Sequence, residues 1–348
     1  MGSAPEYDLS LYDYHLPREL VAQEPARPRS SSRLMVLHPA GAPDHRRFSD
    51  IVDILGEGDV LVMNDSRVIP ARLRGRKTTG GRAEVLLLGP GPSGAWEALC
   101  GGRGLGPGSR VILDDGSTVF LDERISQGRF RVSFDPGVSP WDVMERIGEP
   151  PTPPYIKKVV KDPEDYQTVY ARISGSVAAP TAGLHFDEPL LKALELRGVE
   201  LVHITLHVGI GTFREVRCDD IRDHGMEVER FQISPGAAER LGAALEDGRR
   251  IFPVGTTAVR TLESAAGQDG TIAPGAGSAD IYIYPGYRFK LPFSGMFTNF
   301  HLPRSTPIMM ASAIAGRERI LEAYREAIDL GYRFYSFGDA MLMLRRGR

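Results

Sequence analysis

Short runs of strand-forming residues follow one another closely between residues 69 and 134, and this pattern constrains the fold more than any other feature of the chain. The runs cover residues 83–88, 95–99, 110–113, 118–121 and 129–134. Turn-forming residues separate them, and Asp115-Gly116 and Gln127-Gly128 are the clearest hairpin signals. Short strands joined by tight turns are typical of an all-β barrel. We predict that residues 68–150 form such a barrel, inserted into a larger domain.

The flanking segments, residues 1–67 and 151–348, predict a discontinuous α/β main domain, built as a layered sheet or a distorted barrel. Strand patterns alternate there with helical patterns, which is typical of helices packed on a sheet. We expect strands over 33–37, 59–64, 200–206 and 250–254, and helices over 17–22, 237–246, 258–266 and 317–330. A helix over 141–147 and a stiff proline-rich connector over 150–154 lead back from the barrel, and residues 267–279 are expected to form a mobile loop.

Composition limits the class of protein. The chain has 348 residues, 42% hydrophobic and 25% charged, which is ordinary for a soluble globular protein of two domains. No run approaches 18 consecutive apolar residues, so we expect a cytoplasmic protein with no membrane association and no stable protein partner. Cys100 and Cys218 lack a CxxC pattern, which gives no support for a disulfide framework or a thiolate zinc site.

Three segments combine one histidine with small or turn-forming residues: 175–186 with His185, 206–213 with His207, and 298–306 with His301. Segment 175–186 lacks the apolar period of a packed helix or strand, and its glycines allow close approach to a bound molecule. We therefore predict that the three segments form a ligand site. A further segment, Gly255-Thr256-Thr257, starts a helix with free amides and hydroxyls, which bind a carboxylate or phosphate, cap the helix, or do both.

The same segments carry a resemblance to a known family. Together with residues 64–73, 153–157, 254–264 and 284–289 they make seven motifs in order, and the chain resembles the S-adenosylmethionine:tRNA ribosyltransferase-isomerases of queuosine biosynthesis from about Tyr12 to the C-terminus. The resemblance implies transfer of the ribosyl part of S-adenosylmethionine to a 7-aminomethyl-7-deazaguanine (preQ1) base at the wobble position of tRNA, giving epoxyqueuosine, adenine and methionine. S-adenosylmethionine is then a consumed substrate, and no metal or other cofactor is expected.

Candidate site residues follow from this resemblance and from the loops. Acid or base roles are expected among His185, His207, His301 and Glu229, because neutral imidazole titrates near working pH, and the assignment of roles among the histidines is left open. Substrate binding is expected from Asp65, Arg67, Ser176, Thr181, Gly209, Gly211, Thr212, Thr256, Thr257, Arg260 and Asn299. Contacts to tRNA phosphates are expected from Arg72, Arg74, Arg76, Lys157 and Lys158. Alternatively these cations form a solvated face, and Asp65 pairs with Arg67.

Two patterns that suggest other chemistry are better explained structurally. Residues 102–106 are glycine-rich like a dinucleotide-binding loop, but they lead into a strand, so a barrel turn is expected. His203 and His207 are four residues apart on a predicted strand, about 13 Å apart and too far for one metal ion, and His203 is expected in the core. Two residues depart from the family pattern: Glu227 replaces the histidine of a Met-His-x-Glu motif, and Pro307 lies in a usually aliphatic segment.

Two rival functions are a non-catalytic RNA-binding protein and an S-adenosylmethionine-using enzyme that acts on free nucleosides. An RNA-binding protein has no need of the small-residue histidine segments. The basic clusters and the inserted domain argue against an enzyme of free nucleosides.

Overall fold

The structure is a computed structural model that describes residues 5–91, 94–160, 162–213 and 216–345. The chain forms two compact units. Unit 1 comprises Met1–Ser66, Pro154–Ile173 and Ala179–Arg348, and unit 2 comprises Arg67–Pro153 and Ser174–Ala178. The short segment Ser174–Ala178 therefore belongs with the barrel, whereas the sequence placed it in the main domain. Strands β4 (Ser66–Val68) and β11 (Ile173–Ser176) form a separate two-stranded sheet.

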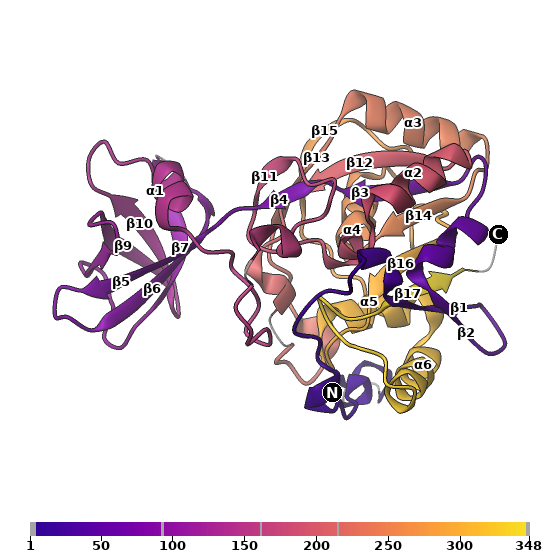
Figure 1. The fold of residues 1–348 in the computed structure, drawn as a ribbon, viewed down its shortest axis with the longest axis horizontal. Coiled ribbons are helices and arrows are strands. Elements are labelled where there is room, and N and C mark those ends of the chain that lie inside the picture. The colour runs from indigo at the N-terminus through magenta and orange to yellow at the C-terminus, as the bar shows by residue number, and fades with distance from the viewer. Residues whose placement is uncertain (1–4, 92–93, 161, 214–215, 346–348) are drawn as a thin grey trace. The chain divides into compact units, whose positions relative to one another are not determined.

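Unit 1 is built on a nine-stranded mixed sheet (Figure 1). Its strands, in spatial order, are β15 (Gly275–Ala279), β13 (Glu229–Ile233), β12 (Glu200–Leu206), β3 (Val60–Asn64), β14 (Ile251–Val254), β16 (Gly295–Asn299), β17 (Ala340–Leu344), β1 (Arg33–Leu37) and β2 (Asp44–Arg47). β12, β3, β14 and β16 are mutually parallel. All five residues of β3 are buried, as expected for a central parallel strand covered on both faces.

Five α-helices belong to this sheet: α2 (Glu188–Leu196), α3 (Pro235–Glu246), α4 (Thr256–Ala265), α5 (Thr306–Ala315) and α6 (Arg317–Asp329). Short polar residues begin two of them, because Asp187 and Ser234 accept hydrogen bonds from Leu190 N and Ala237 N. A core cluster that includes Phe48, Phe186, Phe252 and Phe297 packs against the sheet. No helix in the described residues is long and apolar enough to span a membrane.

Unit 2 is a closed six-stranded antiparallel barrel with the order β10-β7-β6-β5-β8-β9. The strands are β5 (Arg72–Lys77), β6 (Arg82–Pro90), β7 (Trp96–Gly101), β8 (Arg110–Leu113), β9 (Thr118–Ser126) and β10 (Arg129–Phe134), followed by α1 (Pro140–Ile147). Alternate residues point inward, as the burial of Val85 and Leu87 in β6 illustrates. The predicted fold class, an α/β main domain with an inserted all-β barrel, is confirmed.

Three expectations about single segments need correction. Residues 267–279 were expected to form a loop, but Gly275–Ala279 forms edge strand β15, because its backbone pairs with β13 whatever its side chains are. The expected helix over 17–22 is a single 3-10 turn, Arg18–Leu20. His203 is only partly buried, and its ring centroid lies 5.7 Å from that of Tyr170.

Candidate functional site

Two of the predicted histidine segments, 206–213 and 298–306, contain strand ends at one edge of the unit 1 sheet. Because β12, β3, β14 and β16 are parallel, their carboxyl ends share an edge, and this edge is followed by Asp65, His207, Gly255 and His301. Antiparallel β17 begins at the same edge, since Ala340 pairs with Asn299. Carboxyl ends of parallel strands are where α/β sheets bind ligands. Strand topology thus places residues from distant parts of the sequence in one site.

Two helices start at this edge without a side-chain cap. Gly255 precedes α4 with φ of +89°, a conformation that favours glycine, and its lack of a side chain leaves the first amides of the helix without a capping group. Ser305 precedes α5, but its hydroxyl donates to Leu302 O instead of accepting from the helix. The first turn of a helix carries unpaired N–H groups and a partial positive charge. Both starts therefore favour an anionic ligand group.

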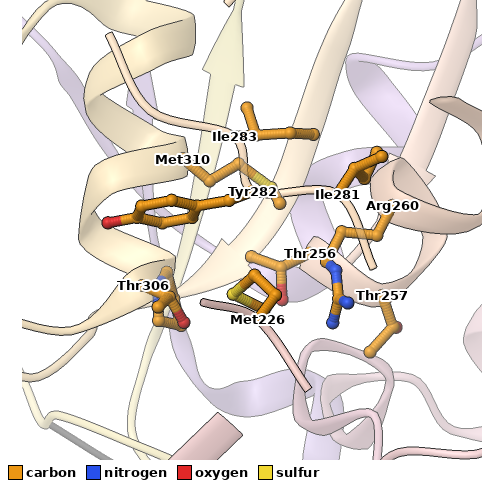
Figure 2. A pocket seen from close by; sticks show the side chains of 10 residues that line it. Met226, Thr256, Thr257, Arg260, Ile281, Tyr282, Ile283, Thr306 and Met310 are labelled. Carbon is orange, nitrogen blue, oxygen red and sulfur yellow. The ribbon is translucent and has the colours of Figure 1, made fainter. Parts of the chain in front are cut away.

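A crevice opens between these helix starts and consists of two cavities that share Thr256 and Pro307 as lining residues. The cavity that we name the tyrosine cavity is also lined by Tyr155, Ala179, Thr181, Asn299, His301, Leu302, Ser305, Tyr335 and Ser336. The arginine cavity is also lined by Met226, Thr257, Arg260, Ile281, Tyr282, Ile283, Thr306 and Met310. Figure 2 shows Arg260 and Thr257 on one side of the arginine cavity and Tyr282 and Thr306 on the other.

The cavities are narrow, but they carry polar atoms suited to a ligand. Their volumes are about 70 Å³ and 20 Å³, below the roughly 300 Å³ of typical small-molecule pockets. Thr257 Oγ1 and Tyr282 Oη have no hydrogen-bond partner among the described residues, although both atoms are buried. Buried hydroxyls are normally satisfied, so these two are available to a bound group. A nucleoside-sized ligand has to widen the crevice as it enters.

His301 is the histidine that lines the crevice. Its Nε2 shares a hydrogen bond of 2.6 Å with the buried Thr298 Oγ1, and its backbone N–H donates to Tyr324 Oη at 3.0 Å. Its Nδ1 has no hydrogen-bond partner in the described part of the chain. Burial lowers the pKa of His301 to about 3, so the ring is neutral at physiological pH. His301 can therefore accept a proton at Nδ1 when Nε2 donates to Thr298.

His185 is buried behind the crevice, and both of its ring nitrogens are engaged. Asn299 Nδ2 donates to Nε2 at 3.0 Å, so the ring carries its proton on Nδ1, which donates to Ser32 Oγ at 2.8 Å. Thr181 Oγ1 in turn donates to Asn299 Oδ1 at 2.8 Å. Burial lowers the pKa of His185 to about 3. The chain of hydrogen bonds fixes Asn299 and Thr181, which line the tyrosine cavity, so His185 is placed to position them.

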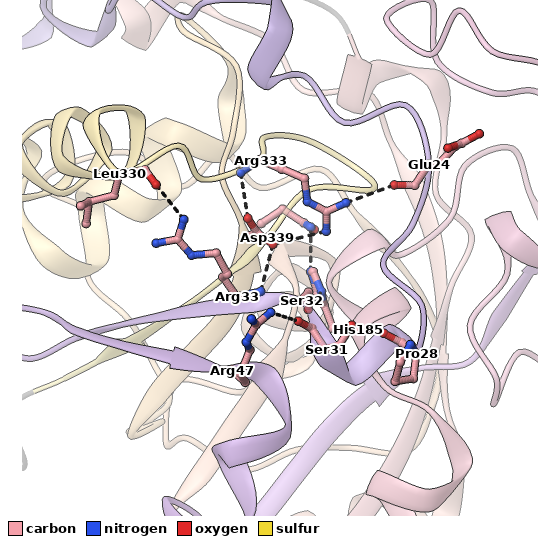
Figure 3. A network of polar contacts seen from close by, with 11 residues as sticks. Glu24, Pro28, Ser31, Ser32, Arg33, Arg47, His185, Leu330, Arg333 and Asp339 are labelled. Carbon is pink, nitrogen blue, oxygen red and sulfur yellow. Dashed lines mark hydrogen bonds and ion pairs between the residues drawn. The ribbon is translucent and has the colours of Figure 1, made fainter.

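The start of β1 and the loop before β17 hold Ser32 beside His185 (Figure 3). The buried carboxylate of Asp339 accepts from the backbone N–H of Arg33 at 2.9 Å and of Arg333 at 2.8 Å. One carboxylate therefore ties together two segments that are about 300 residues apart in sequence. The same loop carries Tyr335 into the tyrosine cavity.

Glu229 and Arg260 form a buried ion pair beside the arginine cavity. Glu229 Oε2 accepts from Arg260 Nη1, and Glu229 Oε1 accepts from Gly209 N at 2.8 Å. Arg260 Nη2 also donates to Ala279 O at 2.7 Å. Burial raises the pKa of Glu229 despite this partner. Glu229 was predicted as an acid or base, but its carboxylate is already used to hold Arg260.

The remaining predicted residues near this ion pair are the glycines after β12 and His207. A Cβ on Gly211 would lie 3.1 Å from Glu227 Cβ, so a larger residue there would require the Glu227 side chain to shift. His207 is partly buried, its Nδ1 has no partner among the described residues, and burial lowers its pKa. Thr212 lies in the 3-10 turn Ile210–Phe213, but its side chain is outside the described part of the structure.

The carboxylate of Asp65 is buried, and other side chains of the protein already bind it. Its carboxylate accepts from Thr205 Oγ1 at 2.7 Å and from Arg172 Nη2 at 2.8 Å, and only 3% of the residue is exposed. The alternative of an Asp65–Arg67 pair is thus wrong in its partner, since the observed partner is Arg172. Arg67 and Ser176 belong to unit 2, not to the unit that contains the crevice.

The predicted tRNA-binding cations differ in their availability. Arg74 makes a bidentate ion pair with Glu149, with both N···O distances 2.8 Å. Arg72 donates to Thr152 O at 3.0 Å. Arg76 is exposed and donates only to Gly80 O. In unit 1, Lys157 is exposed and Lys158 lies 3.3 Å from Glu24 at the surface.

Several lining residues were not predicted from the sequence. Tyr335 has φ of +72°, a strained conformation for a residue with a side chain, and its ring stacks on Tyr155 with centroids 4.6 Å apart. Tyr155 Oη shares a hydrogen bond of 2.7 Å with Ser336 Oγ. Met226 and Tyr282 line the other cavity. Tyr155 lies in a motif that carries the resemblance, whereas no sequence pattern indicated Tyr335 or Tyr282.

Fold and crevice together define an α/β protein with a candidate ligand site at the carboxyl edge of its sheet and a separate β-barrel unit. A family model described as queuosine biosynthesis protein matches residues 9–343. The S-adenosylmethionine:tRNA ribosyltransferase-isomerases of Symbiobacterium thermophilum and Moorella thermoacetica are each 51% identical to the chain, over 97% and 96% of it and 99% and 98% of their own lengths. The crystal structure of the S-adenosylmethionine tRNA ribosyltransferase of Thermotoga maritima is 34% identical, covers 96% of this chain and all of its own, and has a TM-score of 0.54.

The chain therefore belongs to the queuosine biosynthesis protein family. The family predicted from the sequence is confirmed.

Proposed function

We propose that this chain is an S-adenosylmethionine:tRNA ribosyltransferase-isomerase that binds S-adenosylmethionine in the crevice of unit 1. Its family and its full-length relatives support the activity. The observation that carries the location is that two helix starts without side-chain caps open onto one crevice beside His301. The substrate has a carboxylate at its methionyl end, and helix N-termini favour such a group.

Orientation in the crevice follows from the chemistry of the two cavities. The arginine cavity offers the α4 amides and the hydroxyls of Thr257 and Tyr282, which suit the methionyl carboxylate. The tyrosine cavity offers the faces of Tyr155 and Tyr335 with the amide of Asn299, which suit a planar base with hydrogen-bonding edges. The sulfonium and the ribose then lie between the cavities, near Thr256.

The reaction needs a base close to the ribose. The positive sulfur of S-adenosylmethionine acidifies the adjacent C5′ hydrogens, so a neutral imidazole can remove one to form an ylide. The glycosidic bond then breaks and adenine leaves with a proton, and the amine of the preQ1 base in tRNA loses a proton as it bonds to the ribosyl carbon. The C–S bond breaks and methionine departs as a ribosyl oxygen closes the epoxide. We assign the base to His301, while His185 positions Asn299 and Thr181. The reaction is proposed to need no metal or other cofactor.

The test measures adenine and methionine released from S-adenosylmethionine and preQ1-containing tRNA in the presence of a chelator. We expect both products in equal amounts. His301→Gln should lower kcat by about 10²- to 10⁴-fold, the usual contribution of one general base, and leave tRNA affinity near wild type. His38→Gln is the matched control, since His38 follows β1 at the opposite edge of the sheet and pairs with Asp44.

Two results would contradict the proposal. Activity that disappears with chelator and returns with zinc would overturn the metal-free reaction. Equal kcat values for His301→Gln and His38→Gln would show that the base is not His301 in the crevice.

A further inference from the structure

Two adjoining grooves mark the surface of the barrel where the β5–β6 turn meets the β7–β8 loop. Each has a volume above 400 Å³, about 480 Å³ for one and about 450 Å³ for the other. The first is lined by Arg74, Gly75, Arg76, Arg82, Ala83, Glu84, Gly101, Gly102 and Asp114. The second is lined by Lys77, Thr78, Thr79, Arg103, Gly104, Leu105, Gly108, Ser109 and Arg110. These grooves are far larger than either cavity of the crevice.

Positive charge dominates both grooves. Arg76, Lys77, Arg82, Arg103 and Arg110 line them, and none lies within ion-pair distance of a carboxylate in residues 67–91 and 94–153, the described main segment of the barrel. All but Lys77 are exposed. The two acidic lining residues, Glu84 and Asp114, lie in the first groove only. Elsewhere on the barrel, exposed Arg146 is paired with Asp115 at 2.6 Å, whereas exposed Arg124 donates to Leu105 O at 3.0 Å.

Register makes this concentration of charge unfavourable for the barrel alone. Arg76 of β5 lies directly opposite Arg82 of β6. Like charges directly opposite each other destabilise an antiparallel pair. Two positions back in the same ladder, Arg74 lies opposite Glu84, a pair with complementary charges. An anionic partner bound across Arg76 and Arg82 would relieve the repulsion.

Close packing of β5 on β8 and one lysine contact fix the walls of the grooves. Gly75, Gly101 and Gly102 line the first groove, and a Cβ on Gly75 would lie 2.4 Å from Ile112 O. Lys77 Nζ donates to Arg103 O at 2.7 Å and so ties the β7–β8 loop to the end of β5. This contact holds the backbone of Arg103 beside the end of β5. No aromatic side chain lines either groove in the described barrel residues.

We propose that these grooves bind the phosphate backbone of the substrate tRNA, with Arg76, Arg82 and Arg103 as the principal contacts. The inference rests on the proposed function, which supplies an RNA substrate. Guanidinium groups suit phosphate oxygens through two parallel hydrogen bonds. Without aromatic rings to stack on bases, the grooves read backbone shape and charge, not sequence. Arg72 and Arg74, predicted from the sequence, are secondary because their guanidinium groups already have partners.

The experiment compares two double variants of the full-length protein. Arg82→Gln with Arg103→Gln removes two unpaired cations, and Arg131→Gln with Arg146→Gln removes two arginines that are paired with Glu123 and Asp115. Both lose the same charge from the same barrel. Binding of the preQ1-containing tRNA is measured by fluorescence anisotropy between 50 and 200 mM salt, conditions in which phosphate contacts dominate the salt dependence.

We expect the Arg82/Arg103 variant to lower the slope of log affinity against log salt by about 1.4 to 1.8, because each phosphate contact contributes about 0.7 to 0.9. The Arg131/Arg146 variant should keep the wild-type slope. Arg82→Lys with Arg103→Lys, which keeps the charge, should recover most of the slope, and this rescue excludes a folding defect. Equal slopes for the two glutamine variants would overturn the proposal.

Adenine release separates this inference from the proposed function. The Arg82/Arg103 glutamine variant should need more tRNA for half-maximal adenine release, whereas the Arg131/Arg146 variant should match the wild type. Normal release with an unchanged salt slope would refute the groove and leave the enzyme assignment intact. A lowered slope without adenine release from any variant, wild type included, would support the groove and refute the enzyme assignment.

Discussion

The buried pair of Glu229 and Arg260 allows the sharpest prediction about stability. Arg260→Met leaves the Glu229 carboxylate buried with Gly209 N as its one remaining hydrogen-bond donor among the contacts described above. Removing one partner of a buried ion pair typically lowers the free energy of unfolding by about 3–5 kcal/mol, and we expect this range at neutral pH. Adding Glu229→Gln removes the stranded charge, so the double variant should be more stable than Arg260→Met by at least about 1 kcal/mol.

The sign of the pH dependence follows from the pKa of Glu229, which burial already raises above 4.5. Without Arg260 the folded-state pKa rises further, so the folded variant favours the protonated carboxyl. Stability that is present at low pH is then lost as pH rises through that pKa. The deficit of Arg260→Met should therefore be smaller at pH 5 than at pH 7.5.

Denaturant unfolding followed by helical circular dichroism measures this effect, because α2 to α6 lie in unit 1. Both tryptophans, Trp96 and Trp141, lie in unit 2, so their fluorescence gives an internal control that should not change. A deficit below about 1 kcal/mol that is independent of pH would refute the description of Glu229 and Arg260 as a buried pair.

Three further predictions concern histidines and glycines of unit 1. Burial lowers the pKa of His185 from 6.5 to about 3, so this residue should reduce the free energy of unfolding by about 2 kcal/mol as pH falls from neutral to 5. In guanidinium unfolding, the free energy of unfolding of His185→Gln should fall less over this pH range than that of the wild type. An equal fall would contradict this prediction. A Cβ on Gly338 would lie 2.5 Å from Arg333 O, whereas a Cβ on Gly242 inside α3 meets nothing within 4 Å. Gly338→Ala should therefore lower the free energy of unfolding by about 1–3 kcal/mol, and Gly242→Ala should raise it by about 0.5–1 kcal/mol. A higher melting temperature for Gly338→Ala than for Gly242→Ala would refute the packing argument. Burial keeps His301 neutral above about pH 4, so kcat should show no acid limb near pH 6.5, and a limb there that vanishes in His301→Gln would contradict its lowered pKa.

Local signals predicted the barrel and part of the main sheet. Hairpin turns such as Asp115-Gly116 fix adjacent antiparallel strands, and the order β8 to β10 follows directly from the chain. β13 alternates in burial, with Glu229, Phe231 and Ile233 buried, but in the sequence only Phe231 and Ile233 show the apolar period of two. α5 could not be recognised from the sequence, because residues 306–312 are buried on all sides and show no amphipathic period.

The sequence could predict which loops form the candidate site, but not which residues the site residues pair with. Each histidine segment could be found because small residues beside a histidine fit neither a helix nor a strand pattern. Sequence could not show that Asp65 pairs with Arg172 or that His185 hydrogen-bonds both Ser32 and Asn299, since these contacts join segments more than 100 residues apart. The left-handed conformation of Tyr335 is likewise set by its surroundings, including the hydrogen bond from its N–H to Phe300 O.

The most direct test of the central claim follows the atoms of the substrate. The protein is incubated with preQ1-containing tRNA and S-adenosylmethionine labelled with one isotope in the ribose and another in the methyl group, and the tRNA nucleosides are analysed by mass spectrometry. The account predicts that ribose label enters the tRNA base, that methyl label stays in free methionine, and that His301→Gln suppresses both products while His38→Gln does not. Methyl label in the tRNA with release of S-adenosylhomocysteine, or ribose transfer that His301→Gln leaves unchanged, would contradict it.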